Sequence, residues 1–420
     1  MAMATNCTLN LLSFFDRKNY FYPDLPKGYQ ITQFEVPIAQ DGFIAILDNE
    51  GNEKKIGIER IHIEEDTGKS IHIGESSLIN FNRAGTPLVE IVGHPHIRTP
   101  HEASAYLKKL HSILTYLGVS HGNLQEGNFR CDVNVSIHPK GANNFGTRTE
   151  TKNLNSFRNV EKAIEMEIAR QAEILDRGEK VIQQTLNFDA DAMKITVLRT
   201  KSDAQDYRYF PEPDLIPIVV TQQEMNQWKS ELPELPEAKV ARFVSEYSIP
   251  LYDAVVLTTD KALANYFETV VRDYKGEAKK ASNWIMVELL SLLNEFNVGV
   301  EKSPVAAFVL ANLLNAIHEN RISGKQAKDV FIKMFDENKG AEAVINKLGL
   351  VQISDTIALE DMAQKIVSAN PSQVEQYLSG KDRVFGFFVG IMMKETKGQA
   401  NPKTANDIIK KILDSKKGII

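Results

Sequence analysis

The sequence predicts an α+β fold, with mainly antiparallel strands and interposed helices in the first part and helices alone in the second. Up to about Pro217, apolar and polar residues alternate over short stretches, as in half-buried strands, and two longer stretches have helical spacing. Beyond about Leu232 the helical spacing dominates. Three prolines in the segment from Tyr207 to Pro217 predict an extended connection, because proline interrupts a helix.

Composition excludes several classes of protein. The chain has 420 residues, 43% hydrophobic and 25% charged, as in ordinary globular proteins. No stretch approaches the roughly 18 uninterrupted apolar residues of a membrane span, so we expect no membrane partner. Cys7 and Cys131 are too few for a four-ligand zinc site by themselves, and unpaired thiols favour the cytosol.

Charge is divided unevenly along the chain. Residues 381–420 hold nine Lys and Arg against four acids, a net charge of +5, which leaves −11 on residues 1–380. A basic end on an acidic body is typical of a protein that holds a polyanion at one end. A solvated helix rich in Lys would have the same composition, and charge alone leaves both interpretations open.

Helix signals are clear at several places. Thr99 as N-cap, Pro100 at the first helical position and Gly118 as the stop predict the first helix. A second helix is expected from about residue 156 to 178, where apolar residues recur at helical spacing. Further helices should start at residues 303–304 and at a capping box over residues 323–326.

Two strands are predicted to carry an unusually polar face. From residue 130 to 137 the chain alternates strictly, and its polar face holds Arg130, Asp132, Asn134 and Ser136. The stretch 147–152 alternates again, with Arg148, Glu150 and Lys152 on one side. Together these polar faces could line one concave surface. An ordinary antiparallel sheet with a solvated outer face remains the alternative.

Acidic residues near two other strands indicate a metal site. Glu90 lies within the apolar strand 86–92, where a carboxylate needs a cation or a metal as partner. The strand that begins at Ile61 leads into three consecutive acids, residues 64–66, and a glycine turn. Such closely spaced carboxylates suit Mg²⁺, which prefers hard oxygen ligands. A solvated acidic turn is the alternative.

Phosphate binding would need an unusual arrangement in this chain. Residues 16–24 combine two cations with three aromatics, a composition able to hold phosphates and to stack a base. Neither the P-loop nor the dinucleotide-binding glycine pattern occurs. Magnesium held by carboxylates on a concave sheet, with Lys and Arg at the phosphates, would serve instead.

Six segments, in order, resemble the GatB family, the second subunit of the tRNA-dependent amidotransferases. They are residues 16–24 (DRKNYFYPD), 62–69 (HIEEDTGK), 82–90 (NRAGTPLVE), 126–134 (EGNFRCDVN), 152–157 (KNLNSF) and 206–214 (DYRYFPEPD). Residues 349–354 and 397–402 continue the likeness, which covers essentially the whole chain. The resemblance implies a cradle related to glutamine synthetase over residues 1–217, a helical domain over 218–350 and a YqeY-like, tRNA-binding tail over 351–420.

The family's activity is then expected of this chain. The GatB subunit uses ATP and Mg²⁺ to phosphorylate the side-chain carboxylate of Glu-tRNA(Gln) or Asp-tRNA(Asn), and ammonia displaces the phosphate. An amidase subunit supplies the ammonia, and a small third subunit joins both in a heterotrimer. By motif the resemblance implies metal ligands at Glu65 and Glu90, catalytic or channel-mouth residues at Lys18, Asp132, Glu126, Glu150 and Lys152, and cofactor-binding residues at Arg83, Arg130 and Asn134.

Members of the family begin well before the position of Met1, with a Glu-x-His strand that supplies metal ligands and, in some, a zinc-binding cysteine set. Because this chain lacks that segment, we expect low activity of the chain as written. A tRNA- and partner-binding fragment without turnover is therefore the alternative function. A magnesium nuclease using the same acids is a third hypothesis, but it leaves the helical half unexplained.

Overall fold

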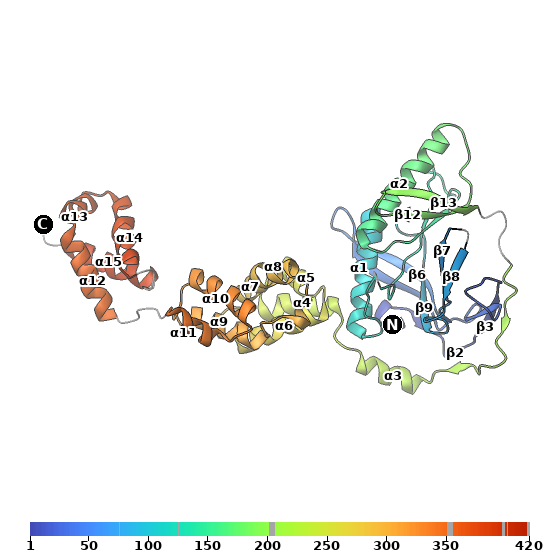
Figure 1. Cartoon of the computed structure of the whole chain (residues 1–420), viewed down its shortest axis with the longest axis horizontal. Coiled ribbons are helices and arrows are strands. Elements are labelled where there is room, and N and C mark those ends of the chain that lie inside the picture. The colour runs from blue at the N-terminus through green and yellow to red at the C-terminus, as the bar shows by residue number, and fades with distance from the viewer. Residues whose placement is uncertain are drawn as a thin grey trace. The chain divides into compact units, whose positions relative to one another are not determined.

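A computed structural model describes residues 1–74, 76–124, 126–200, 206–350, 356–396, 400 and 402–417. The chain divides into two units, Met1–Pro236 and Glu237–Ile420. The first contains the sheets and the second is helical, which confirms the predicted α+β fold (Figure 1). The finer domain boundaries at residues 217 and 350 stay predictions, and residues 351–355 lie outside the described part. Among the described residues, no helix is both long enough and apolar enough to cross a membrane.

An antiparallel sheet of four strands is the centre of the first unit. Its order is β1-β5-β6-β9, formed by Thr8–Leu9, Ala39–Leu47, Glu53–Glu65 and Pro87–Gly93. Strand β9 pairs with the last part of β6, which places Glu90 directly opposite His62. The strand predicted around Glu90 is therefore confirmed, and its register decides which side chains surround this acid.

Helix α1 (Pro100–Leu117) packs against β5 and against α2 (Phe157–Asp176). The Thr99 side chain accepts a hydrogen bond from the backbone N–H of Glu102, and Gly118 ends the helix in the left-handed conformation, as predicted. Its apolar stripe joins a buried core with the inner face of the sheet. This core includes Ile44, Ile56, Ile58, Ile61, Leu107, Leu110 and Leu114.

A second four-stranded sheet has the order β10-β11-β12-β13, formed by Val133–Val135, Thr149–Lys152, Gln184–Asp189 and Lys194–Thr200. Helix α2 connects β11 to its parallel neighbour β12. The alternation predicted for β10 and β11 is confirmed, but β10 is shorter than expected. It stops at Val135 because the N–H of Ile137 donates to the side chain of Gln171 on α2 instead of to a strand.

Small sheets complete the first unit. Strands β3 (Asp16–Asn19), β4 (Tyr29–Thr32) and β14 (Phe210–Pro211) form one, in the order β14-β3-β4. The others are the pair β2 (Leu12–Ser13) with β15 (Ile218–Val219) and the hairpin β7 (Lys69–Ile73) with β8 (Ser76–Asn80). The proline-containing segment is thus extended, as predicted, and it returns the chain to the first strands. Helix α3 (Gln222–Glu231) follows it.

The second unit begins with eight α-helices up to residue 350, interrupted by a π-helical segment, Ile285–Leu289. They are α4 (Pro236–Tyr247), α5 (Leu251–Leu257), α6 (Lys261–Asp273), α7 (Ala278–Trp284), α8 (Leu290–Glu295), α9 (Ala307–His318), α10 (Gly324–Glu337) and α11 (Ala341–Leu348). The capping box at Ser323 is confirmed. The helix start predicted at Ser303 is wrong: its hydroxyl accepts from the N–H of Val305 in a local turn, and α9 begins at Ala307.

The last helices form a core of their own. They are α12 (Thr356–Ala369), α13 (Pro371–Leu378), α14 (Phe385–Glu395) and α15 (Pro402–Lys417). Buried residues of this core run from Leu359 to Leu413 and include Phe388, Met392 and Ile409. Within the motif expected at residues 397–402, residues 397–399 and 401 lie outside the described part.

Candidate active site

Three side chains of the first sheet are close enough to share a cation. His62 and Glu64 lie on β6 and Glu90 on β9, and one ligand atom from each lies within 4.8 Å of the others. The Nε2 atom of His62 is 3.6 Å from Glu64 Oε2 and 3.7 Å from Glu90 Oε2. His62 and Glu64 are buried, whereas the side chain of Glu90 is 49% exposed. The group therefore opens to solvent on the Glu90 side.

The strand period explains the membership of this group. Residues two apart on β6 point to the same face, so Glu64 accompanies His62 and Glu65 points the other way. Glu65 accepts a hydrogen bond from the backbone N–H of Ile31 at 2.8 Å and forms an ion pair with Lys27. The structure thus places Glu65 against β4 and does not bring it together with Glu90. Glu64 occupies the position expected of Glu65.

The donor set fits a hard divalent cation. Two carboxylates are the usual protein contribution to a magnesium site, which keeps several waters as further ligands. The Nδ1 atom of His62 is buried and has no hydrogen-bond partner among the described residues. A buried polar atom of this kind is costly unless a ligand or water satisfies it. This observation supports a bound species next to His62.

Two arginines meet at a neighbouring acid. Asp66 follows β6 directly, and its Oδ2 atom lies 2.6 Å from Arg130 Nη2 and 3.1 Å from Arg83 Nη2. Arg83 also donates through Nη1 to the backbone carbonyl of Gly127 at 3.0 Å. The structure thus brings together the two arginines that were expected to bind a cofactor. The carboxylate of Glu126 stays in its exposed loop, where it accepts from the side chain of Asn128.

A third polar group lies on the second sheet. Lys152 of β11 pairs with Asp132 and lies 3.6 Å from Glu150 Oε1. Thr185 of β12 donates to the other oxygen of Glu150 at 3.1 Å. Asn134 lies directly opposite Glu150 in the strand register and therefore shares its face. Four residues selected from the sequence are thus brought together.

These three groups belong to one surface of the first unit. Asp66 comes two residues after Glu64, and Asp132 comes two residues after Arg130. Two residues of extended chain span about 7 Å at most, so each group lies beside the next. The order along the surface is metal-binding acids, paired arginines, and then the Lys152 group.

An aromatic row flanks the acids. Lys18 Nζ lies 4.8 Å from the centre of the Tyr207 ring and forms no ion pair with the described residues. Tyr207 touches Tyr209, which stacks on Phe34 with ring centres 4.1 Å apart. Burial raises the pKa of Tyr209 to about 12, and neighbouring Glu90 and Glu64 add to the shift while Arg60 opposes it. The segment that follows β13 therefore reaches the acidic group.

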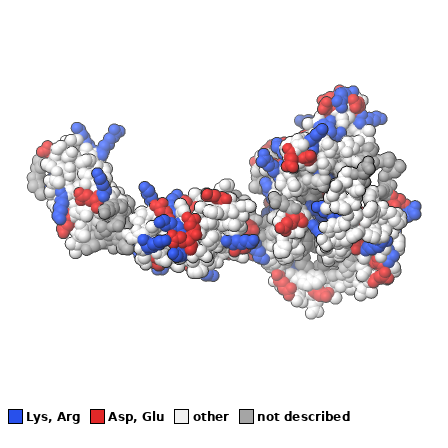
Figure 2. Space-filling view, in the orientation of Figure 1, with Lys and Arg blue, Asp and Glu red and all other residues white. Residues whose placement is uncertain are grey.

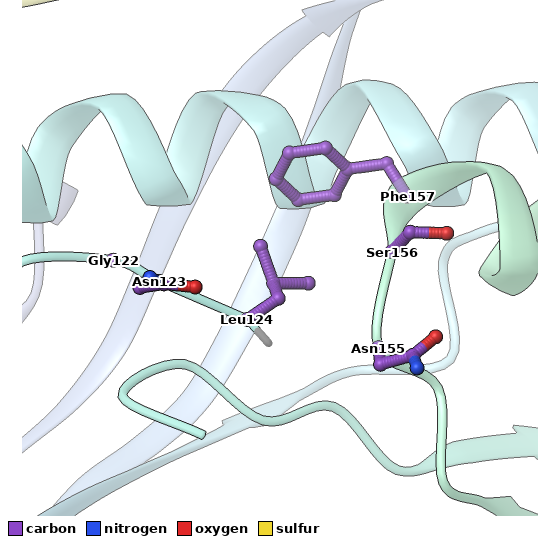
Figure 3. A pocket seen from close by; sticks show the side chains of 6 residues that line it. All are labelled: Gly122, Asn123, Leu124, Asn155, Ser156 and Phe157. Carbon is purple, nitrogen blue, oxygen red and sulfur yellow. The ribbon is translucent and has the colours of Figure 1, made fainter. Parts of the chain in front are cut away.

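An open pocket of 320 Å³ lies between the chain after α1 and the start of α2 (Figure 3). Leu124 and Phe157 supply its apolar side. The Ser156 hydroxyl accepts from the backbone N–H of Asn159, and the Asn155 side chain accepts from the side chain of Asn159. Because these polar groups already serve the start of α2, the pocket is not assigned to the candidate active site.

The described cysteines are unsuited to nucleophilic catalysis. Burial raises the pKa of Cys131 to about 12, with a smaller contribution from Asp132. Burial also raises the pKa of Cys7. Since the thiolate is the reactive form, neither side chain is activated at neutral pH.

Sequence reasoning did not select His62, Glu64 or Asp66 as site residues. All three belong to the acidic stretch that was singled out, but the choice among its members depends on which face pairs with Glu90. Applying the two-residue period backward from Glu64 would have grouped it with His62. The contact between Asp66 and two distant arginines has no local sequence signal.

Comparison with known proteins agrees with this site. Residues 1–226 match the model of the GatB/GatE catalytic domain, and residues 265–413 match the GatB domain. The chain belongs to the GatB family. All three polar groups of the site lie in the part that matches the catalytic domain of the family.

Similar curated proteins are named as the GatB subunit of aspartyl/glutamyl-tRNA(Asn/Gln) amidotransferase. The one from Syntrophotalea carbinolica is 53% identical over 412 residues, which cover 98% of this chain and 86% of that protein. The one from Chlorobium phaeobacteroides is 52% identical over 99% of this chain and 87% of its own length. The one from Thermodesulfovibrio yellowstonii is 48% identical over 98% of this chain and 86% of its own length.

Proposed function

We propose that this chain works as the GatB subunit of an aspartyl/glutamyl-tRNA amidotransferase, a ligase of protein biosynthesis. It activates the side-chain carboxylate of Glu-tRNA(Gln), Asp-tRNA(Asn) or both with ATP, and ammonia then forms the amide. The observation that carries this proposal is the 53% identity over 98% of the chain to a protein of that name. The three adjacent polar groups in the catalytic part support it.

The first proposed step transfers the terminal phosphoryl group of ATP to the substrate carboxylate. Such transfer depends on positioning and on neutralisation of charge more than on covalent help from the protein. Glu64 and Glu90, with His62 beside them, would hold magnesium. The bound ion would neutralise the phosphate oxygens. Lys18, Arg83 and Arg130 are the cations proposed to face the nucleotide.

The second proposed step replaces phosphate by ammonia. Ammonium must lose a proton before its nitrogen can attack the activated carbonyl carbon, and the phosphate then leaves with the bonding electrons. Asp132 and Glu150 are proposed to accept protons there, with Lys152 orienting both carboxylates. Asn134, on the same face, can donate hydrogen bonds to the substrate carbonyl.

Three partners are proposed. An amidase subunit would supply ammonia, and a small third subunit would join both in the heterotrimer. The misacylated tRNA would be held partly by residues 351–420. In this region Lys and Arg side chains project from the visible face of the described residues (Figure 2). Their contacts would be mostly with phosphates and therefore sensitive to salt.

The test is a reconstituted amidation assay. The chain is purified together with its two proposed protein partners and given Glu-tRNA(Gln), glutamine, ATP and magnesium. We expect Gln-tRNA(Gln), with no product when ATP or magnesium is omitted, and an activated, phosphorylated aminoacyl-tRNA when glutamine is withheld. Product formation without ATP would contradict the proposal. Retained tRNA binding without any product would instead support a binding fragment.

A further inference from the structure

One buried carboxylate holds two exposed arginines in the candidate site. The side chain of Asp66 is 8% exposed, whereas that of Arg130 is 54% exposed. Both guanidinium groups reach the same oxygen, Oδ2, and the other oxygen accepts the backbone N–H of Thr67 at 3.0 Å. Asp66 therefore has no oxygen left that faces solvent unpaired.

The two arginines are held differently. Arg83 is fixed at both ends of its guanidinium group, by Asp66 at Nη2 and by the carbonyl of Gly127 at Nη1. Arg130 is held through Nη2 alone. Its Nη1 and Nε atoms make no hydrogen bond to any described residue. Arg83 thus anchors the loop, and Arg130 keeps donors available on an exposed side.

Charge favours an anion at this place. Two cations share one carboxylate, so the group keeps one positive charge near solvent. Without the carboxylate the guanidinium groups would repel each other and the fork of Arg130 would lose its orientation. A fixed guanidinium fork matches phosphate oxygens, which accept parallel hydrogen bonds. The acids proposed to hold magnesium begin two residues away, at Glu64.

We propose that Asp66 is a positioning residue that aims the free donors of Arg130 at phosphate oxygens of the bound nucleotide. This inference rests on the proposed function, and it assigns to Asp66 an indirect role that acts through Arg130. Phosphates of the tRNA backbone offer the same chemistry, so binding of nucleotide and of tRNA must be measured separately.

The experiment is a double-mutant cycle on the full chain. Asp66→Asn, Arg130→Gln and the double variant are titrated with a fluorescent, non-hydrolysable ATP analogue in magnesium, and in parallel with tRNA. We expect each single variant to weaken analogue binding about tenfold, near 1.4 kcal/mol. The double variant should bind no more weakly than Arg130→Gln, because Asp66 acts through Arg130. Affinity for tRNA should not change.

Asp48→Asn is the matched control. Asp48 accepts backbone N–H groups of Glu50 and Asn52 in the turn before β6, at the other end of that strand. It should bind the analogue as the wild type does. Arg130→Gln leaves the buried carboxylate in place, so it tests the site even if Asp66→Asn lowers the melting temperature.

Several results would overturn the inference. Additive losses in the double variant would make Asp66 a structural residue, and a loss of tRNA affinity alone would assign Arg130 to the tRNA backbone. Unchanged binding in Asp66→Asn would remove its role. In each case the wild type still binds the analogue and makes amide, whereas failure of the wild type in both assays would reject the proposed function itself.

Discussion

The side of β6 on which an acid lies decides its partner. Glu64 faces Glu90, and Glu65 faces β4. We expect Glu64→Gln and Glu90→Gln to weaken the magnesium dependence of amidation at least about tenfold, with partial recovery at high magnesium. Glu65→Gln should keep nearly normal dependence, since an amide oxygen can still accept the N–H of Ile31. Magnesium titrations of the three variants check this prediction.

The outcome for Glu65 separates two assignments. A magnesium dependence in Glu65→Gln as weak as in Glu64→Gln would return Glu65 to the metal site, as the resemblance implied. Binding of tRNA serves as the control, because none of these three side chains is proposed to contact the tRNA phosphates. All three variants should bind tRNA normally.

An ion pair joins the two ends of the first unit. The guanidinium of Arg17 donates two hydrogen bonds of 2.8 Å to Glu212, whose side chain is 1% exposed. These bonds lower the pKa of Glu212, although burial opposes the shift. The stabilisation is therefore fully present above the unfolded-state pKa of about 4.3 and is lost as the pH falls through the lower folded-state value.

Glu212→Gln tests this pair. We expect the free energy of unfolding at pH 7 to fall by about 1–3 kcal/mol, because the partly buried Arg17 loses its charged acceptor. The difference from the wild type should shrink as the pH is lowered below about 4.3. Urea unfolding over a pH series measures both effects. Asp214→Asn, which removes an exposed acid from the same arginine, is the control and should cost less than about 1 kcal/mol.

The sequence could predict a metal site at Glu90 because a lone carboxylate within an apolar strand needs a cation. It could not choose between Glu64 and Glu65, since adjacent residues of a strand point to opposite faces. That choice depends on pairing register, which is a long-range property. Lys152 was predicted in the same surface as Asp132, and their contact follows because alternation places polar residues of neighbouring strands on one face.

At the level of elements, helix α2 anchors the second sheet through a buried polar network. The Glu167 carboxylate accepts hydrogen bonds from Thr149 at 2.7 Å and from Gln171 at 2.8 Å, and it pairs with Arg170. Gln171 in turn bonds the backbone around the end of β10. This network holds the strands that carry Asp132, Glu150 and Lys152.

Glu167→Ala should therefore disturb both stability and the site. We expect a loss of about 3 kcal/mol, because the variant leaves a charged arginine and two buried donors without an acceptor. Glu165→Ala on the exposed face of the same helix should change stability by less than about 1 kcal/mol. Urea unfolding of both variants is the measurement, and equal effects would contradict the anchoring role.

Element boundaries show where local signals fail. The start of α1 was predictable because Thr99, Pro100 and Gly118 act through their immediate neighbours. The end of β10 was not, because a side chain of α2 captures the N–H of Ile137. At Ser303 the hydroxyl closes a turn on Val305 instead of capping a helix, and both outcomes are open to a serine followed by proline.

For the whole molecule, the sequence could predict a basic end and a helical second half but not how its helices group. The core formed by residues 359–413 depends on contacts between helices that are far apart in the sequence. This core gives the region from α12 to α15 a hydrophobic interior of its own. The expected role of residues 351–420 in binding tRNA can therefore be examined by removing the region and by changing its charges.

Salt dependence distinguishes phosphate contacts from other binding. Each phosphate contact that is lost lowers the slope of log affinity against log salt by roughly 0.7–0.9. Deleting residues 351–420 should weaken tRNA binding and flatten this slope, while ATP-analogue binding by the first unit persists. Lys394→Gln with Lys410→Gln, which removes two exposed lysines that form no ion pair with described residues, should lower the slope by up to about 2.

The matched control removes the same charge elsewhere. Lys339→Gln with Lys347→Gln affects two lysines that pair with Glu337 at the end of α10, outside the basic region. If formal charge alone governed tRNA affinity, both double variants would lower the slope equally. We expect only the variant in the last helices to do so, because phosphate contacts are local and exposed charges are screened beyond about 10 Å. Equal slopes in all variants, or a deletion without effect, would place the tRNA contacts elsewhere in the chain.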